Sequence, residues 1–273
     1  MTVTSTDTLV IESTSSKVRT FLYELAEGTS NYRSLHSLTE QVEHQYHGRF
    51  IVELIQNAHD ALLPPAGNES GKTSRIEIAL KDEGEFGTLY VANDGQPFSV
   101  SNFNSLSQLG QSDKNPQESI GNKGIGFRSV LEITEAPVIY SRSMLKSPGF
   151  DGFNFAFSPE VIRRLTAPVL ALLNGDDAAV SPFGNVPLVD WDARLLAKFR
   201  ASVTRIARRE KMAAEVWLAK ELTYLSPYLL PFPPNCREAH TFVLECERRG
   251  FSTLIRFPLK NASTLELVRE KLN

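Results

Sequence analysis

The sequence contains little cysteine, and this scarcity limits the kinds of protein it can encode. Only Cys236 and Cys246 occur among 273 residues. They lie ten residues apart and no metal-ligand pattern accompanies them, which argues against a disulfide framework and against a cysteine-based metal site. We therefore expect both thiols to be reduced and structural, as is typical of a cytoplasmic protein.

Long apolar runs and a large excess of charge are also missing. No apolar run approaches the length that spans a membrane, and the N-terminus lacks the apolar core of a signal peptide. The formal net charge is -3, which argues against a general electrostatic attraction to nucleic acid but leaves a local basic patch open. Hydrophobic residues make up 41% of the chain and charged residues 22%. This composition predicts a globular cytoplasmic protein with a packed core.

Apolar periodicity and turn residues predict helices that alternate with pairs of strands. Residues 1–16 are rich in Thr and Ser and predict a loose tail. A helix capped by Ser37 or Thr39 is expected to end before Pro64. Further helices are predicted at 17–28, 101–109, 127–132, 159–173, 191–222 and 263–272, and strands at 74–81, 88–93, 138–141, 153–157, 241–247 and 252–258. Asp190 is the predicted cap of the long helix 191–222.

This order of elements predicts an α+β fold. We expect a two-layer α/β sandwich, in which helices cover one face of a single mixed, mostly antiparallel sheet. Residues 17–273 would form one domain, with a helical insert at about 159–234. Because the chain stops inside a predicted helix, we expect it to be the N-terminal part of a longer protein.

The stretch from Ile51 to Ala61 places three polar side chains on one face of a helix. Glu53, Asn57 and Asp60 stand at positions i, i+4 and i+7. An acid beside a phosphate can orient a water molecule, and an amide oxygen is a ligand that Mg²⁺ accepts. An ordinary solvated helix face is the alternative interpretation. The apolar side chains expected on the opposite, buried side are Ile51, Leu54, Ile55 and Leu62.

Three other stretches carry candidate binding groups. Asn93-Asp94-Gly95 closes a predicted strand, where an oxygen can accept from an amino group, although this tripeptide is also a common turn. The glycine-rich segment 121–126 runs into a helix, and freed backbone N–H groups there favour phosphates. Thr253 offers a hydroxyl on a late strand, or it merely suits that strand.

Taken together, the order and spacing of these four stretches resemble the nucleotide-binding domain shared by gyrase, the heat-shock chaperone, histidine kinases and MutL, known as the Bergerat fold. The strings Asn-Asp-Gly-Gln-Pro-Phe and Ile-Gly-Asn-Lys-Gly-Ile-Gly-Phe are most similar to the N-terminal ATPase-like regions of sacsin and related large proteins. The resemblance covers residues 38–137 and 241–259. It departs from the family at Asn93, where the family has an adenine-binding Asp, and at Pro97, where it has a second glycine.

The resemblance implies a Mg²⁺-dependent ATPase. Glu53 would activate water, Asn57 would hold Mg²⁺, and a lid over residues 98–121 would close on ATP and signal to downstream domains or protein partners. It is compatible with a nucleotide-dependent dimer, and it does not indicate nucleic acid. The residues expected at the nucleotide are Asn57, Asp60, Ala61, Asn93, Asp94, Gly95, Phe98, Gly121, Asn122, Lys123, Gly124, Ile125, Gly126, Phe127 and Thr253.

Other functions remain open at the level of sequence. A nucleotide-sensing module would bind ATP or ADP with the same groups and without useful turnover, although Glu53 favours hydrolysis because binding alone does not need that acid. A histidine kinase would need a phosphoacceptor helix, and no convincing one is present. A topoisomerase or mismatch-repair role would need a transducer domain after residue 273.

Overall fold

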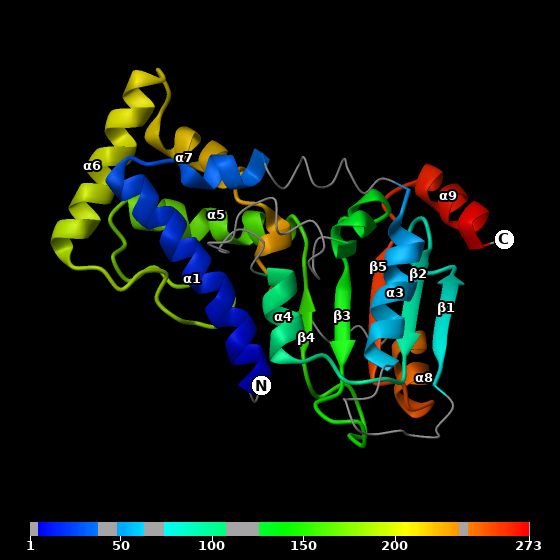
Figure 1. The fold of residues 1–273 in the computed structure, drawn as a ribbon. Coiled ribbons are helices and arrows are strands. Elements are labelled where there is room, and N and C mark those ends of the chain that lie inside the picture. The colour runs from blue at the N-terminus through cyan, green and yellow to red at the C-terminus, as the bar shows by residue number, and fades with distance from the viewer. Residues whose placement is uncertain (1–4, 38–47, 63–73, 108–125, 235–239, 273) are drawn as a thin grey trace. The chain divides into compact units, whose positions relative to one another are not determined.

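The computed structural model describes residues 5–37, 48–62, 74–107, 126–234 and 240–272, and the chain forms two compact units (Figure 1). Unit 1 consists of residues 1–41 and 158–232, and unit 2 consists of residues 42–157 and 233–273. The second segment of unit 1 corresponds to the helical stretch predicted at about 159–234. In each unit, segments that are distant in sequence build one core.

Unit 1 is helical. Its elements are α1 (Ser5–Glu27), a helical segment at 31–37, α5 (Glu160–Leu173), α6 (Ala193–Arg209), α7 (Ala214–Leu222) and the short 3₁₀ helix η2 (Pro227–Leu229). Helix α1 packs against α6, and α7 packs against both α5 and α6. Both tryptophans, Trp191 and Trp217, belong to this unit.

The N-terminal helix is longer than the sequence predicted. The predicted loose tail over residues 1–16 is wrong from Ser5 onwards, because α1 begins there. Val10, Ile11 and Thr14 are buried, and the Thr14 hydroxyl donates to the Pro231 carbonyl. These residues extend the apolar stripe of α1 by two further turns. The Thr- and Ser-rich composition concealed this stripe.

The long helix predicted at 191–222 is in fact two helices. Helix α6 ends at Arg209, and Lys211 adopts a left-handed backbone with φ 57° before α7 begins. Because a lysine rather than a glycine or proline stands at this break, no local residue indicates that the helix ends there. The apolar periodicity therefore predicted one continuous helix. The predicted cap was also wrong by two residues. Asp192, rather than Asp190, accepts from the Leu195 backbone N–H at 2.8 Å.

Unit 2 contains a five-stranded sheet in the order β1-β2-β5-β3-β4. The strands are β1 (Ile76–Lys81), β2 (Thr88–Asn93), β3 (Val138–Ser141), β4 (Asn154–Ala156) and β5 (Thr253–Pro258). All four strand pairings are antiparallel. The predicted α+β class is confirmed, and the described sheet is antiparallel rather than mixed.

Helices lie against both faces of the sheet. Helix α3 (Phe50–Leu62) packs against β1, β2 and the 3₁₀ helix η1 (Gly126–Glu132), as Figure 1 shows. The ring centroids of Phe127 in η1 and Phe257 in β5 lie 6.3 Å apart. Helix η1 therefore covers the face of the sheet that carries Phe257. Helix α4 (Val100–Ser107) contributes Phe103 to an aromatic cluster, and α9 (Ala262–Leu272) ends the chain.

The opposite face carries a helix where the sequence predicted a strand. Residues 241–247 belong to α8 (Thr241–Arg248), whose Phe242 and Cys246 pack against Tyr90 and Ala92 of β2. The alternation of Phe242, Leu244 and Cys246 imitated a strand. Leu244 is exposed, however, and the two buried residues stand four apart, which is helical spacing. The predicted hairpin of 241–247 with 252–258 and the placement of all helices on one face are therefore wrong.

Cys246 is a free, buried thiol, as predicted. Burial in the apolar layer under α8 raises its pKa to about 12, and the nearby Glu77 carboxylate adds to the rise. Such a thiol remains protonated at neutral pH and acts as a small apolar side chain. Cys236 lies outside the described residues.

Candidate functional site

Helix α3 presents the predicted polar face towards solvent. Asn57 and Asp60 are exposed and Glu53 is half-buried, whereas Phe50, Leu54 and Ala58 are buried. The predicted apolar side is only partly correct, because Ile55 is 41% exposed. The spacing therefore identified the polar face, but the buried stripe follows Phe50, Leu54 and Ala58 and leaves Ile55 outside it. All three polar side chains remain accessible to a ligand.

The C-terminal end of α3 is fastened to the turn that follows β2. The Gln96 backbone N–H donates to the Ala61 carbonyl at 2.7 Å. A Cβ atom on Gly95 would stand 2.2 Å from that carbonyl oxygen and 2.9 Å from the Leu62 backbone nitrogen. Gly95 is thus required by the close approach of the α3 backbone. This contact fixes α3 relative to the strand end that carries Asn93.

Substitution of Gly95 by alanine is expected to destabilise unit 2 by about 3 kcal/mol, because the new Cβ must displace backbone atoms rather than a flexible side chain. Urea unfolding followed by circular dichroism would measure the loss. Gly149→Ala is the matched control, since its Cβ would meet only the Glu247 side chain, at 3.0 Å. Equal stability of the two variants would contradict the proposed fastening of α3.

A row of buried polar side chains crosses the ends of three neighbouring strands. Asn93 of β2 pairs in register with Thr253 of β5, and Thr253 pairs with Ser141 of β3. Their exposed fractions are 6%, 5% and 0%. The Thr253 and Ser141 hydroxyl oxygens stand 3.5 Å apart. Asn93 and Thr253, which were both expected at the nucleotide, therefore stand opposite each other on neighbouring strands, and sequence reasoning missed Ser141.

Asn93 and Asp94 have different surroundings. Asn93 Oδ1 accepts from the Gly95 backbone N–H at 3.2 Å, which leaves Nδ2 to donate elsewhere. The Asp94 carboxylate accepts from the Arg75 backbone N–H at 2.8 Å and from Arg75 Nε at 3.1 Å. Its side chain is 4% exposed. Arg75 therefore engages both oxygens of the Asp94 carboxylate.

Ser141 also contacts the start of the predicted lid. Its hydroxyl oxygen accepts from the Phe98 backbone N–H at 2.8 Å. The Phe98 ring lies 5.7 Å from that of Phe155, within the aromatic cluster that includes Phe103 and Phe153. The predicted lid therefore begins at a residue that is held to the sheet. Ser141 could have been identified from sequence only as the polar residue that closes a predicted strand.

The glycine-rich segment is only partly described. Gly126 opens η1 and Phe127 is buried against the sheet, which gives Phe127 a packing role. Because η1 packs against α3, the end of this segment lies beside the helix that carries Glu53. The predicted phosphate-binding residues that fall outside the described residues are Gly121, Asn122, Lys123, Gly124 and Ile125.

The described residues contain no cluster of three or more His, Cys, Asp or Glu side chains that could hold a metal ion on its own. Magnesium commonly takes one or two protein oxygens and completes its coordination with water and substrate phosphates. The exposed Asn57 amide and the half-buried Glu53 carboxylate fit that donor chemistry. None of the described helices is long and apolar enough to cross a bilayer.

Comparison with known proteins finds similarity over part of this chain. Residues 33–148 match the Sacsin domain family. A stretch of 126 residues is 32% identical to Protein NO VEIN of Arabidopsis thaliana, and it covers 46% of this chain but 4% of that protein. The chain thus matches a small part of a much longer relative. Both similarities support a sacsin-like family, and the match to residues 33–148 includes α3, Asn93 and the glycine-rich segment.

Proposed function

We propose that unit 2 binds ATP together with Mg²⁺ and hydrolyses it slowly. The observation that carries the proposal is the strand register that brings Asn93, Thr253 and Ser141 into one row, beside the turn to which α3 is fastened. This arrangement gathers three of the four sequence motifs on one side of the sheet. The similarity to the Sacsin domain over residues 33–148 supports the same reading.

Each residue would have a separate task. The Asn93 amide and the Thr253 hydroxyl would hydrogen-bond the base, and the exposed Asn57 oxygen would hold the metal beside the phosphates. Glu53 would orient or deprotonate the attacking water. Because Asn93 presents a donor where the resembled family has an acceptor, discrimination between adenine and guanine is expected to be modest. Bound magnesium would supply neutralisation of phosphate charge.

Asn57→Ala is expected to abolish Mg²⁺-dependent nucleotide binding while the fold is retained, because Asn57 is exposed and its side chain contributes no burial to α3. Calorimetric titration with ATP, in the presence and absence of Mg²⁺, would measure the change. His59→Ala is the matched control, since His59 is also exposed but lies on the opposite side of the same helix. If Asn57→Ala binds Mg-ATP as tightly as the parent protein, the metal assignment fails.

A second candidate function is nucleotide sensing without turnover. The accessible Asn57 and the Asn93–Thr253 pair would serve binding equally well in a sensor. Phosphate release from the parent chain at saturating ATP distinguishes the two functions. In either case nucleotide would alter the segment that begins at Phe98, through the hydrogen bond between the Phe98 N–H and Ser141, and so signal to partners.

A further inference from the structure

Helix α6 of unit 1 carries a positively charged surface that has no role in the proposed nucleotide site. Its residues 193–209 include no aspartate or glutamate. The exposed basic face of α6 consists of Arg194, Lys198, Arg205, Arg208 and Arg209. These side chains recur at spacings of three, four and seven residues, which places them on one side of the helix. From Arg194 to Arg209 the face extends about 22 Å along the helix axis.

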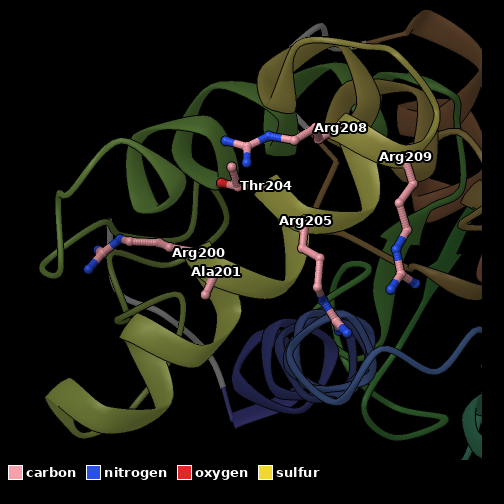
Figure 2. Close-up of a pocket in the computed structure, with 6 residues that line it drawn as sticks. All are labelled: Arg200, Ala201, Thr204, Arg205, Arg208 and Arg209. Atoms are coloured by element: carbon pink, nitrogen blue, oxygen red, sulfur yellow. The ribbon is translucent and has the colours of Figure 1, made fainter.

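The C-terminal half of this face borders a shallow hollow, which Figure 2 shows. Two neighbouring rows of side chains border it, each with a spacing of four residues. Arg200, Thr204 and Arg208 form one row, and Ala201, Arg205 and Arg209 form the other. The arginine side chains of the two rows project in different directions from the helix, and the small Ala201 leaves room between them. The hollow is thus bordered by guanidinium groups and one hydroxyl.

Some of these cations already have partners and others do not. Arg200 forms an ion pair with Asp177 and donates from Nη2 to the Leu172 carbonyl at 2.9 Å. Lys198 pairs with Glu27 at 2.5 Å. In the described part of the chain, no carboxylate lies within ion-pair distance of Arg194, Arg205, Arg208 or Arg209. These four positive charges therefore have no carboxylate partner there.

Part of the basic face is unfavourable for the helix itself. Arg194 with Lys198 and Arg205 with Arg209 are like-charged pairs four residues apart, and each such pair costs about 0.2–0.5 kcal/mol. Arg194 also lies in the first turn, where the helix dipole disfavours a cation, whereas Arg208 and Arg209 lie in the last turn, where the dipole favours one. Other helices of the chain alternate their charges: α5 pairs Glu160 with Arg163, and α9 pairs Glu266 with Arg269. Helix stability alone therefore does not account for the composition of α6.

We propose that the basic face of α6 binds the phosphate backbone of a nucleic-acid duplex without regard to sequence. Four of the five residues of this face are arginines, whose planar fork matches phosphate oxygens. The neighbouring Thr204 hydroxyl adds a donor of the kind that contacts phosphates. The only aromatic residue of α6, Phe199, is fully buried, so the face offers no surface on which unpaired bases could stack. The net charge of -3 argues against a general attraction of the whole chain to nucleic acid, so binding would depend on a local basic face such as that of α6.

The test measures binding of the full chain to a fluorescent DNA duplex of about 20 base pairs by anisotropy, across a range of salt concentrations, and repeats the measurement with an RNA duplex. Four arginines that each neutralise one phosphate predict a fall of about 100-fold in affinity between about 50 and 200 mM salt. Arg208→Gln/Arg209→Gln is expected to weaken binding at least about tenfold at the lower salt and to reduce the salt slope by about 2. Arg205 is left intact because it lies beside Gly28, at the end of α1.

Two further variants serve as controls for this experiment. Arg163→Gln/Arg269→Gln removes the same charge from exposed arginines elsewhere and should bind like the parent. Arg208→Lys/Arg209→Lys keeps the charge and should retain most of the salt slope, which excludes misfolding as the cause of a loss. Equal weakening in the two glutamine variants would overturn the proposal, as would salt-independent binding. Preference for a poly-glutamate peptide or for anionic vesicles over both duplexes would also overturn it.

Discussion

Replacement of Glu53 by alanine should remove ATP hydrolysis while leaving ATP affinity nearly unchanged. Glu53 is half-buried on α3, one helical turn before Asn57 on the same face. An acid that orients water acts mainly in the transition state, so its loss should lower kcat rather than weaken binding. General-base loss typically costs about 10²–10⁴-fold in rate. Removal of a negative charge beside the phosphates would, if anything, strengthen ATP binding.

Phosphate release at saturating ATP would be measured in parallel with calorimetric affinity for three proteins: the parent, Glu53→Ala and Glu53→Gln. The glutamine variant keeps the size and hydrogen bonding of the side chain but cannot accept a proton, so it should be as inactive as alanine. Hydrolysis by Glu53→Ala at the parental rate would mean that another group is the base. A parent protein that releases no phosphate would favour the sensor function.

Replacement of Glu221 by alanine is expected to cost unit 1 about 3 kcal/mol of stability. Glu221 of α7 is fully buried, and its carboxylate accepts from the Tyr32 hydroxyl at 2.5 Å and from Arg33 Nε at 3.0 Å. Arg33 Nη2 donates to the other carboxylate oxygen. The alanine variant would leave the Tyr32 hydroxyl without its acceptor and the Arg33 charge without its partner, and it would open a cavity as well. Burial raises the pKa of Tyr32, and the hydrogen bond to Glu221 adds to that rise.

Tryptophan fluorescence during urea unfolding measures this loss selectively, because Trp191 and Trp217 are the only tryptophans and both belong to unit 1. Glu215→Ala on the same helix is the matched control, since Glu215 is exposed and its loss should cost less than about 1 kcal/mol. Tyr32→Phe removes one hydrogen bond and should cost about 1 kcal/mol. A Glu221→Ala variant no less stable than Glu215→Ala would show that the buried carboxylate does not hold residues 32 and 33 to α7.

The sequence by itself determined the elements that short-range periodicity specifies. The three polar residues of α3 stand three and four apart, so any helix would place them on one face. Strands β1, β2 and β3 were predicted from apolar alternation and turn residues, and each was found within two residues of its predicted bounds. Local spacing gave a wrong prediction in α8, where the apolar residues fit both the two-residue period of a strand and the four-residue spacing of a helix. It also did so near Lys211, where a helix ends without glycine or proline.

Only the tertiary structure decided which groups meet. Ser252 and Asn93 are 159 residues apart in sequence, and their hydrogen bond exists because β5 enters the sheet between β2 and β3. Strand order fixes that register, and no local pattern encodes it. Local sequence also does not show that Gly95 is required because the end of α3 packs against it. Nor does it show that Arg75 donates a hydrogen bond to the Asp94 carboxylate. Burial of Glu221 beside Tyr32 and Arg33 likewise depends on two helical segments that only folding brings together.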